Sequence, residues 1–216
     1  MQNKEPSLRG NAVKRIVKEI QSGELAPNVA LTEAQICEKF GLSRTPAREA
    51  LIELVTNGIM IKIPRKGYCV REFTTKDKLD IYAVLAINDA FAAKLAMDHM
   101  TEEDYMKMNK LIDLMDISIK YKNYYDYNEQ QSDFHQVYTD KCGNQFLIDK
   151  LLEIKESVPH YIYYSDSSDK VFDACKEANN EHIQIVKFFK AHDLEKLTDL
   201  LVNTHWIAKE KYIDMI

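Results

Sequence analysis

The sequence predicts a mostly α-helical protein in two parts: a small N-terminal part with one β-hairpin, and a larger part made of helices alone. Two observations support this prediction. Apolar residues recur at the three- and four-residue spacing of amphipathic helices over much of the 216 residues. Strand-like runs are confined to residues 59–63 and 68–72, and Gly143 is the only glycine after them. We therefore expect one domain over residues 1–73 and a second over residues 74–216.

Three short helices are expected before the hairpin. The first covers residues 8–22 and ends at Gly23, a residue type that commonly follows a helix. Thr32 can cap the second helix, and Gly41 ends it in a tight turn. Ser43 can cap the third helix in the same way. The order helix, tight turn, helix is that of a helix-turn-helix, whose second helix enters the major groove of DNA.

The two strand-like runs should then form a wing around the turn at 64–67, which carries two cations and a glycine. Arginine side chains at the exposed start of the third helix suit phosphates and base edges. Taken alone, the wing could equally be a surface hairpin with solvated charges. Together with the helix-turn-helix order, it predicts a winged helix-turn-helix. The candidate DNA-binding residues are Ser43, Arg44, Thr45, Arg48, Arg65, Lys66 and Gly67.

The charge is distributed unevenly between the two parts. The whole chain has a net charge of -5, but residues 1–73 hold 12 Lys or Arg against 8 Asp or Glu. Residues 74–216 hold 17 against 26, and all the arginines lie in the first part. This asymmetry favours a basic domain that faces DNA and an acidic domain that does not. Chance in a lysine-biased composition is the alternative explanation.

The bulk composition narrows the class of protein. The sequence has no run of 18 apolar residues and no apolar core of a signal peptide near its N-terminus, so a membrane protein is not expected. The four cysteines are widely spaced and form no C-x-x-C pair, which favours reduced thiols. We therefore expect a cytoplasmic protein.

The second domain should be an all-α bundle of about six helices. Apolar stripes at helical spacing indicate these helices, and Thr101 begins one of them. Facing helices of a bundle often build a ligand or metal site from their side chains. The stripes cover residues 79–97, 105–119, 134–138, 146–154, 183–189 and 194–207.

Three histidines from three of these helices are candidate metal ligands: His135, His182 and His205. Converging imidazoles could bind a divalent ion such as Zn, Ni or Mn. Gln131, which shares a helix face with His135, and Asp89 are candidate residues of an effector pocket. The alternative is that the histidines are unrelated core or surface residues.

The N-terminal stretches SGEL (22–25), LTEAQICEKFGLSRTPAREALIELVTNGIM (31–60) and PRKGYCV (64–70) resemble the DNA-binding domain of GntR-family transcriptional regulators. The most specific part is the SRTPxREAL core. The resemblance implies that Arg44 and Arg48 contact the operator and that Gly67 enters the minor groove. Ala34 stands where the family often has an arginine, which implies a different operator preference.

The FH-x7-GN pattern that begins at residue 134, and the EH pair at 181–182, resemble the FCD subgroup of that family. The resemblance implies a metal bound by one Asp and three His, with a small carboxylate effector completing its shell. Three positions depart from the pattern. Gln131 replaces the Asp, His205 lies one residue beyond the usual histidine, and Leu85 replaces an arginine suited to a carboxylate.

The sequence thus predicts a ligand-responsive transcriptional regulator, most simply a repressor, and not an enzyme. A homodimer is expected, because two recognition helices then read the two halves of an inverted-repeat operator in double-stranded DNA. A small-molecule effector in the bundle would change DNA affinity through a coupling free energy. A metal-dependent enzyme on the bundle and a DNA-binding protein without an effector are the alternatives.

Overall fold

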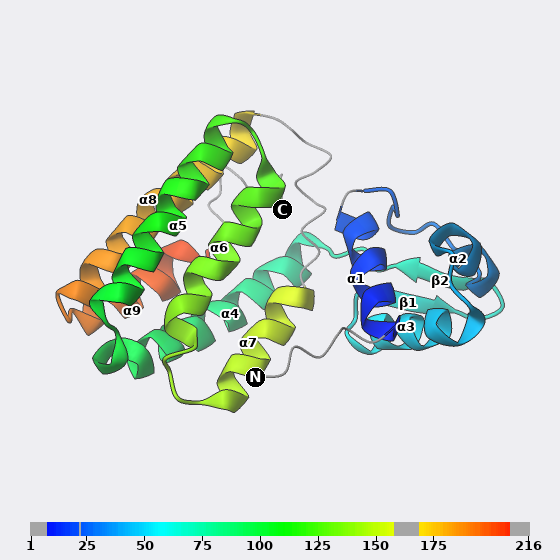
Figure 1. Ribbon diagram of the computed structural model, residues 1–216, viewed down its shortest axis with the longest axis horizontal. Helices are drawn as coiled ribbons and strands as arrows, with labels where there is room; N and C mark the ends of the chain where they lie inside the picture. Colours follow the sequence, from blue (N-terminus) through cyan, green and yellow to red (C-terminus); the bar gives the residue numbers. More distant parts are fainter. Residues whose placement is uncertain (1–7, 22, 158–168, 208–216) are drawn as a thin grey trace. The chain divides into compact units, whose positions relative to one another are not determined.

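The computed structural model describes residues 8–21, 23–157 and 169–207. The chain divides into two compact units, one built mainly from the residues up to Thr74 and the other mainly from Thr75 onward (Figure 1). Each unit is described by itself. In the described part of the chain, no helix is both long and apolar enough to cross a membrane.

The N-terminal unit contains three helices followed by a hairpin. The helices are α1 (Leu8–Gln21), α2 (Glu33–Phe40) and α3 (Arg44–Thr56), and the strands are β1 (Met60–Ile63) and β2 (Gly67–Val70). The strands are antiparallel, with Met60 opposite Val70. This order is the predicted winged helix-turn-helix, although both strands are shorter than the sequence runs suggested.

Local sequence signals explain the ends of the helices in the N-terminal unit. Thr32 forms a capping box with Gln35 at the start of α2, as expected for a threonine in that position. Gly41 ends α2 in the left-handed conformation, with φ of 60°. Ser43 occupies the N-cap position of α3, but the expected capping bond is absent because its side chain accepts no hydrogen bond from the helix.

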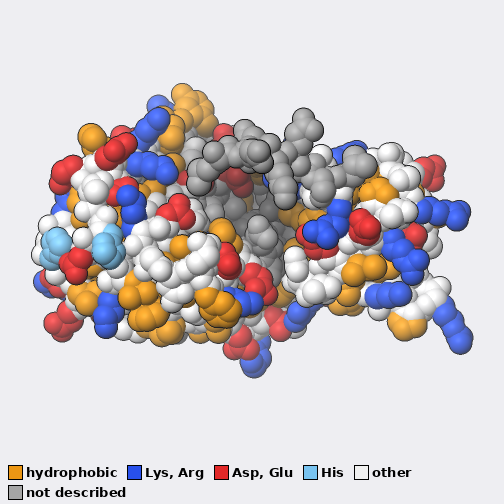
Figure 2. Space-filling model, turned by 60° about the horizontal axis from the view of Figure 1, so that its bottom comes forward, with side chains coloured by type: hydrophobic (Ala, Val, Ile, Leu, Met, Phe, Trp, Pro, Cys, Tyr) orange, Lys and Arg blue, Asp and Glu red, His pale blue; other side chains and the backbone are white. Residues whose placement is uncertain are grey.

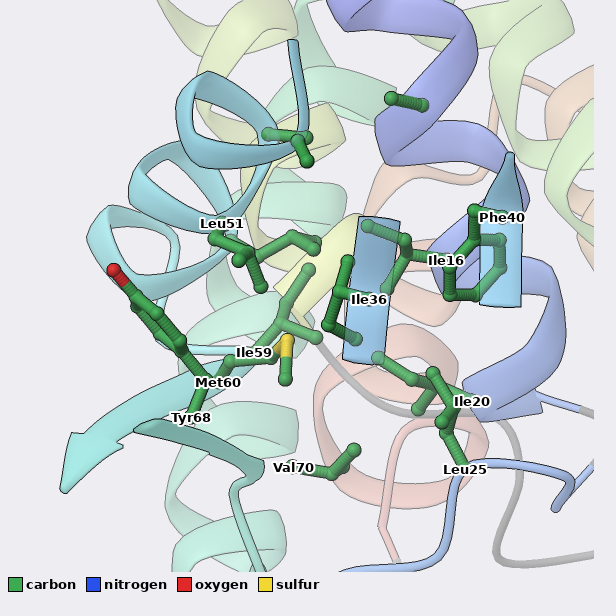
Figure 3. Packing of buried hydrophobic residues seen from close by; sticks show 14 residues of the cluster. Ile16, Ile20, Leu25, Ile36, Phe40, Leu51, Ile59, Met60, Tyr68 and Val70 are labelled. Carbon is green, nitrogen blue, oxygen red and sulfur yellow. The ribbon is translucent and has the colours of Figure 1, made fainter. Parts of the chain in front are cut away.

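A single core holds helix α3 against the rest of this unit (Figure 3). Ile16 of α1, Ile36 of α2 and Leu51 of α3 are fully buried in it. Met60 and Val70 of the wing close the same core. Because the three helices and both strands pack into this one core, the orientation of α3 relative to the wing is fixed.

The C-terminal unit contains helices and one three-residue 3₁₀ turn among its described residues. These elements are α4 (Thr75–Ala96), η1 (Met97–His99), α5 (Glu102–Lys120), α6 (Tyr124–Thr139), α7 (Gln145–Ser157), α8 (Asp169–Lys190), α9 (Leu194–Leu200) and η3 (Leu201–His205). Helix α5 packs between α6 and α8, and α4 packs against α6, α9 and η3 (Figure 1). The predicted all-α architecture is confirmed.

Two helices are longer than their predicted apolar stripes, and a third predicted helix ends in an irregular turn. The apolar stripes at 134–138 and 183–189 mark only parts of α6 and α8, because the remaining turns of these helices carry more polar residues. The expected helix over 194–207 changes after Leu200 into η3, which is a π-helical turn. This turn affects the position of one candidate metal ligand.

Candidate DNA-binding surface and metal centre

Helix α3 exposes one face and buries the other. Ala47, Ala50 and Leu51 are completely buried in the core of the N-terminal unit. The predicted DNA-binding residues of this helix lie on the opposite side and are exposed: Ser43, Arg44, Thr45 and Arg48. The first turn of α3 is therefore exposed enough to enter a groove of DNA.

The arginines of this unit fall into two groups. Arg9 pairs with Glu53 (Nε–Oε2 2.9 Å), and Arg15 lies 5.7 Å from the ring centroid of Phe40. Arg71 also lies over an aromatic ring. The other arginines make no ion pair or ring contact with a described residue, and Figure 2 shows Lys and Arg side chains projecting from this unit. They are Arg44, Arg48 and Arg65.

The wing turn is shaped by its backbone. Arg65 has a φ of 64°, and both it and Lys66 are exposed. Gly67 has a φ of 111°, and a Cβ atom there would lie 2.3 Å from the carbonyl oxygen of Leu31. Leu31 and Tyr68 exchange two backbone hydrogen bonds of 2.7 and 2.8 Å at this point. The fold itself therefore requires glycine at residue 67, whatever the turn contacts.

The three candidate metal ligands meet inside the C-terminal unit. His135 comes from α6, His182 from α8 and His205 from η3. One ligating atom from each lies within 4.8 Å of those of the other two, and the Nε2 atoms of His135 and His205 are 3.0 Å apart. His135 and His182 are fully buried. The structure thus brings the three histidines together.

A hydrogen-bond acceptor faces the Nδ1 atom of each histidine. The acceptors are Asp89 Oδ2 for His135 (3.1 Å), Asn179 Oδ1 for His182 (3.2 Å) and Glu181 Oε2 for His205 (3.0 Å). A neutral imidazole that donates from Nδ1 presents the lone pair of Nε2. All three lone pairs are then directed toward the shared centre, as in metal sites supported by carboxylates.

The pKa values of the buried histidines favour the neutral, ligating form. Burial lowers the pKa of His135 to about 4, although the neighbouring Asp89 acts in the opposite direction. Burial also lowers the pKa of His182 well below its ordinary value, and the other two histidines add to this effect. Both rings are therefore neutral at pH 7, which is the form that binds a metal.

Asp89 of α4 lies within this centre. Its Oδ2 atom accepts hydrogen bonds from Tyr138 Oη (2.6 Å) and Trp206 Nε1 (2.8 Å), in addition to the contact with His135. Burial alone would raise the pKa of the Asp89 carboxyl, but His135 and Tyr138 lower it below its usual range. Gln131 lies one helical turn before His135 and is half-buried.

The π-helical turn explains how His205 reaches the centre. The sequence places His205 one residue too late, and one extra residue turns a side chain by about 100° in an α-helix. A π-helical turn accommodates such an extra residue within the helix. Because Leu201–His205 forms this turn, His205 faces the other two histidines. The one-residue departure of His205 from the family spacing therefore does not keep it away from the centre.

The residues present fit a divalent metal ion. The Nε2 atom of His182 is buried and has no hydrogen-bond partner, a costly state for a polar atom. Two imidazole nitrogens bound to one zinc ion at about 2.0–2.1 Å lie roughly 3.0–3.4 Å apart. The 3.0 Å between His135 and His205 falls in this range.

Sequence reasoning missed the residues that orient the histidines. Tyr138 lies one helical turn after His135, and Asn179 one turn before His182, so helical spacing could have identified both. Glu181 and Trp206 adjoin His182 and His205 in the sequence. No sequence signal could have shown that the Trp206 ring lies 4.7 Å from that of His135.

Comparisons with known proteins agree with both units. The family model described as bacterial regulatory proteins of the gntR family matches residues 8–70, and the FCD domain model matches residues 80–205. The uncharacterized HTH-type transcriptional regulator YdhC of Bacillus subtilis is 26% identical over 204 residues, which cover 87% of this chain and 89% of that protein. The HTH-type transcriptional repressor RspR of Escherichia coli is 26% identical over 141 residues, or 65% of this chain and 62% of that protein. The E. coli McbR/YncC structure has a TM-score of 0.77 at 18% identity, covering 90% of this chain and 92% of that one, which shows a common fold.

Proposed function

Because the chain belongs to the GntR family of bacterial regulatory proteins and carries an FCD domain, we propose that it is a repressor whose N-terminal domain binds an operator and whose C-terminal domain binds an effector. Members of this family are DNA-binding transcriptional regulators and not enzymes. The domains are residues 1–73 and 74–216, and the protein acts in the cytoplasm. The central observation is the convergence of three histidine Nε2 atoms in the second domain.

The operator contacts are assigned to two elements. Arg44 and Arg48 read base edges in the major groove, because they are exposed at the start of α3 and make no ion pair or ring contact with a described residue. Ser43 and Thr45 are placed to contact the adjacent phosphates. Arg65 and Lys66 of the wing contact the backbone, and Gly67 allows the turn to approach it closely.

The metal site consists of His135, His182 and His205. Three imidazoles suit zinc or nickel better than manganese, which prefers oxygen ligands. FCD domains commonly bind a metal, and this histidine cluster could hold one. When bound, the ion would supply a positive centre with open positions for a small anionic effector. A DNA-binding protein without an effector, which would use the three histidines only for a structural metal, is the alternative.

A homodimer is proposed from one surface of α4. This helix buries Leu85, Ala92 and Ala93 within its own unit, yet it also exposes a second apolar stripe. Helices that are apolar on both sides are normally covered on both sides. Two copies of the chain would then present two recognition helices to an inverted repeat. The exposed stripe, here called the α4 stripe, consists of Val84 (51% exposed), Ile87 (58%) and Phe91 (47%).

Titration of DNA with variants tests the operator assignment. Arg48→Ala should weaken operator binding by about 1–3 kcal/mol and reduce discrimination against a scrambled duplex, because it removes a base contact. Lys66→Ala should weaken both duplexes equally and flatten the salt dependence. Lys14→Ala is the matched control, since Lys14 is exposed on α1. If Arg48→Ala binds operator like the Lys14 variant, the assignment of α3 as recognition helix is wrong.

A further inference from the structure

The exposed face of α3 carries an acidic residue that the proposed operator contacts do not use. Glu49 follows Arg48 in the chain and lies one helical turn after Thr45, and all three residues are exposed. Thr45 and Glu49 lie about 40° apart around the helix, because each residue turns it by about 100°. Ile52, one turn further on, is 53% exposed. Glu49 is therefore surrounded by exposed residues on the face of α3 that is turned away from the core.

The Glu49 carboxylate is not neutralised by any described residue. The next acidic residue of α3, Glu53, is paired, since its Oε2 atom lies 2.9 Å from Arg9 Nε. Glu49 makes neither an ion pair nor a hydrogen bond with the part of the chain that the structure describes. The first turn of α3 contains no acidic residue. The helix thus begins with two exposed arginines, Arg44 and Arg48, and then presents one unpaired negative charge beside them.

A carboxylate in this position needs a hydrogen-bond donor when DNA is bound. If Arg48 reads a base edge, Glu49 enters the same groove, where phosphates of like charge flank it and water is displaced. A charge that loses its water without gaining a partner is costly. Phosphate oxygens accept hydrogen bonds but do not donate them, so the donor for Glu49 must come from a base edge.

The four bases differ in what they offer to a carboxylate in the major groove. Guanine presents two acceptors, thymine an acceptor and a methyl group, and adenine a donor beside the N7 acceptor. Cytosine alone presents a donor, its N4 amino group, without an acceptor. We infer that Glu49 is a specificity-determining residue that accepts a hydrogen bond from the N4 group of a cytosine, at or next to the base pair that Arg48 reads. This inference rests on the proposed role of α3 as recognition helix.

Selection of binding sites from random-sequence DNA duplexes by the full-length protein tests this inference. The wild type should select cytosine at one position where Glu49→Gln selects adenine, because glutamine pairs with N6 and N7 of adenine. The other selected positions should stay the same. In titrations of two duplexes that differ only at that position, the wild type should bind the cytosine duplex about tenfold more tightly, and Glu49→Gln should reverse the order.

Glu49→Ala should bind the two duplexes about equally and should bind scrambled DNA no more weakly than the wild type, because it removes a negative charge and no phosphate contact. Retained binding of scrambled DNA also shows that the variant is folded. The control is Glu103→Gln, which should select the wild-type site, since Glu103 is exposed on α5 of the other unit. Identical base preferences for the wild type and Glu49→Gln, or a wild-type base other than cytosine at the position that changes, would overturn the inference. If the wild type selects no sequence, the proposed role of α3 fails as well.

Discussion

At the scale of single residues, the histidine centre depends on the groups behind each ring. Asp89, Asn179 and Glu181 each accept from one Nδ1 atom. These contacts fix the tautomer, so they decide that Nε2 and not Nδ1 faces the centre. The candidate ligands could be named from the sequence because histidine is a distinctive residue. Asp89 could be named only as a pocket residue, and the supporting role of the three acceptors could not be read from the sequence, because carboxylates and amides are common on helix surfaces.

The lowered pKa of His135 predicts acid sensitivity of the metal-free protein. Below pH 6.5 the unfolded chain takes up a proton at this residue, whereas the folded chain does so only near pH 4. Acidification across that window therefore favours unfolding. We expect His135 to account for a loss of about 2 kcal/mol between pH 7 and pH 5.

Urea unfolding of chelator-treated protein, followed by Trp206 fluorescence, measures this loss. His135→Asn is the comparison, because asparagine does not titrate. The variant should show a smaller difference between the two pH values than the wild type, whatever its stability at pH 7. Equal differences for both proteins would contradict the assigned burial of a neutral His135.

At the scale of elements, most helices could be predicted but one irregular turn could not. Thr32 and Gly41 mark the ends of α2 through local hydrogen bonds and backbone conformation, so their effect can be deduced from the sequence. The π-helical turn at Leu201–His205 has no such local signal. The contacts that stabilise this turn join His205 and Trp206 to residues of α4, α6 and α8, which are distant in the sequence.

The π-helical turn predicts an asymmetric response to changes in chain length. Deleting Asn203, an exposed residue within the turn, should convert the turn to α-helix and leave the histidine at the centre. Inserting one Ala after Asn203 should instead rotate the histidine away by about 100°. Competition with a chromogenic zinc chelator measures both variants. Loss of zinc binding on deletion, with retention on insertion, would show that the turn has another role.

At the scale of the whole molecule, the proposed regulation couples the two units within a homodimer. The charge asymmetry of the sequence predicts a basic helix-turn-helix unit and an acidic helical unit. It could not identify the α4 stripe, because exposed apolar residues on a helix have the same spacing as buried ones. Only the burial of Leu85 and Ala92 on the other side of α4 distinguishes the stripe.

The α4 stripe predicts that dimerisation can be disrupted without unfolding the chain. Ile87→Glu combined with Phe91→Glu should give monomers in sedimentation equilibrium, because both side chains are exposed within their own unit but would be covered in the dimer. The double variant should also lose affinity for an inverted repeat more than for a single half-site. Met106→Glu on α5 is the control, since Met106 is 64% exposed and lies off the stripe. A double variant that remains dimeric would exclude this interface.

The central claim is that the C-terminal unit holds a metal through three histidines, and zinc binding by the full-length chain tests it most directly. Elemental analysis and chelator competition should find a single tightly bound ion per chain in the wild type. His182→Asn should abolish this binding, because it removes the buried Nε2 atom, which has no hydrogen-bond partner among the described residues. His192→Asn should bind zinc like the wild type, since His192 is exposed and faces Asp98 rather than the other histidines. Absence of a bound ion in the wild type, or undiminished binding in the His182 variant, would contradict the account.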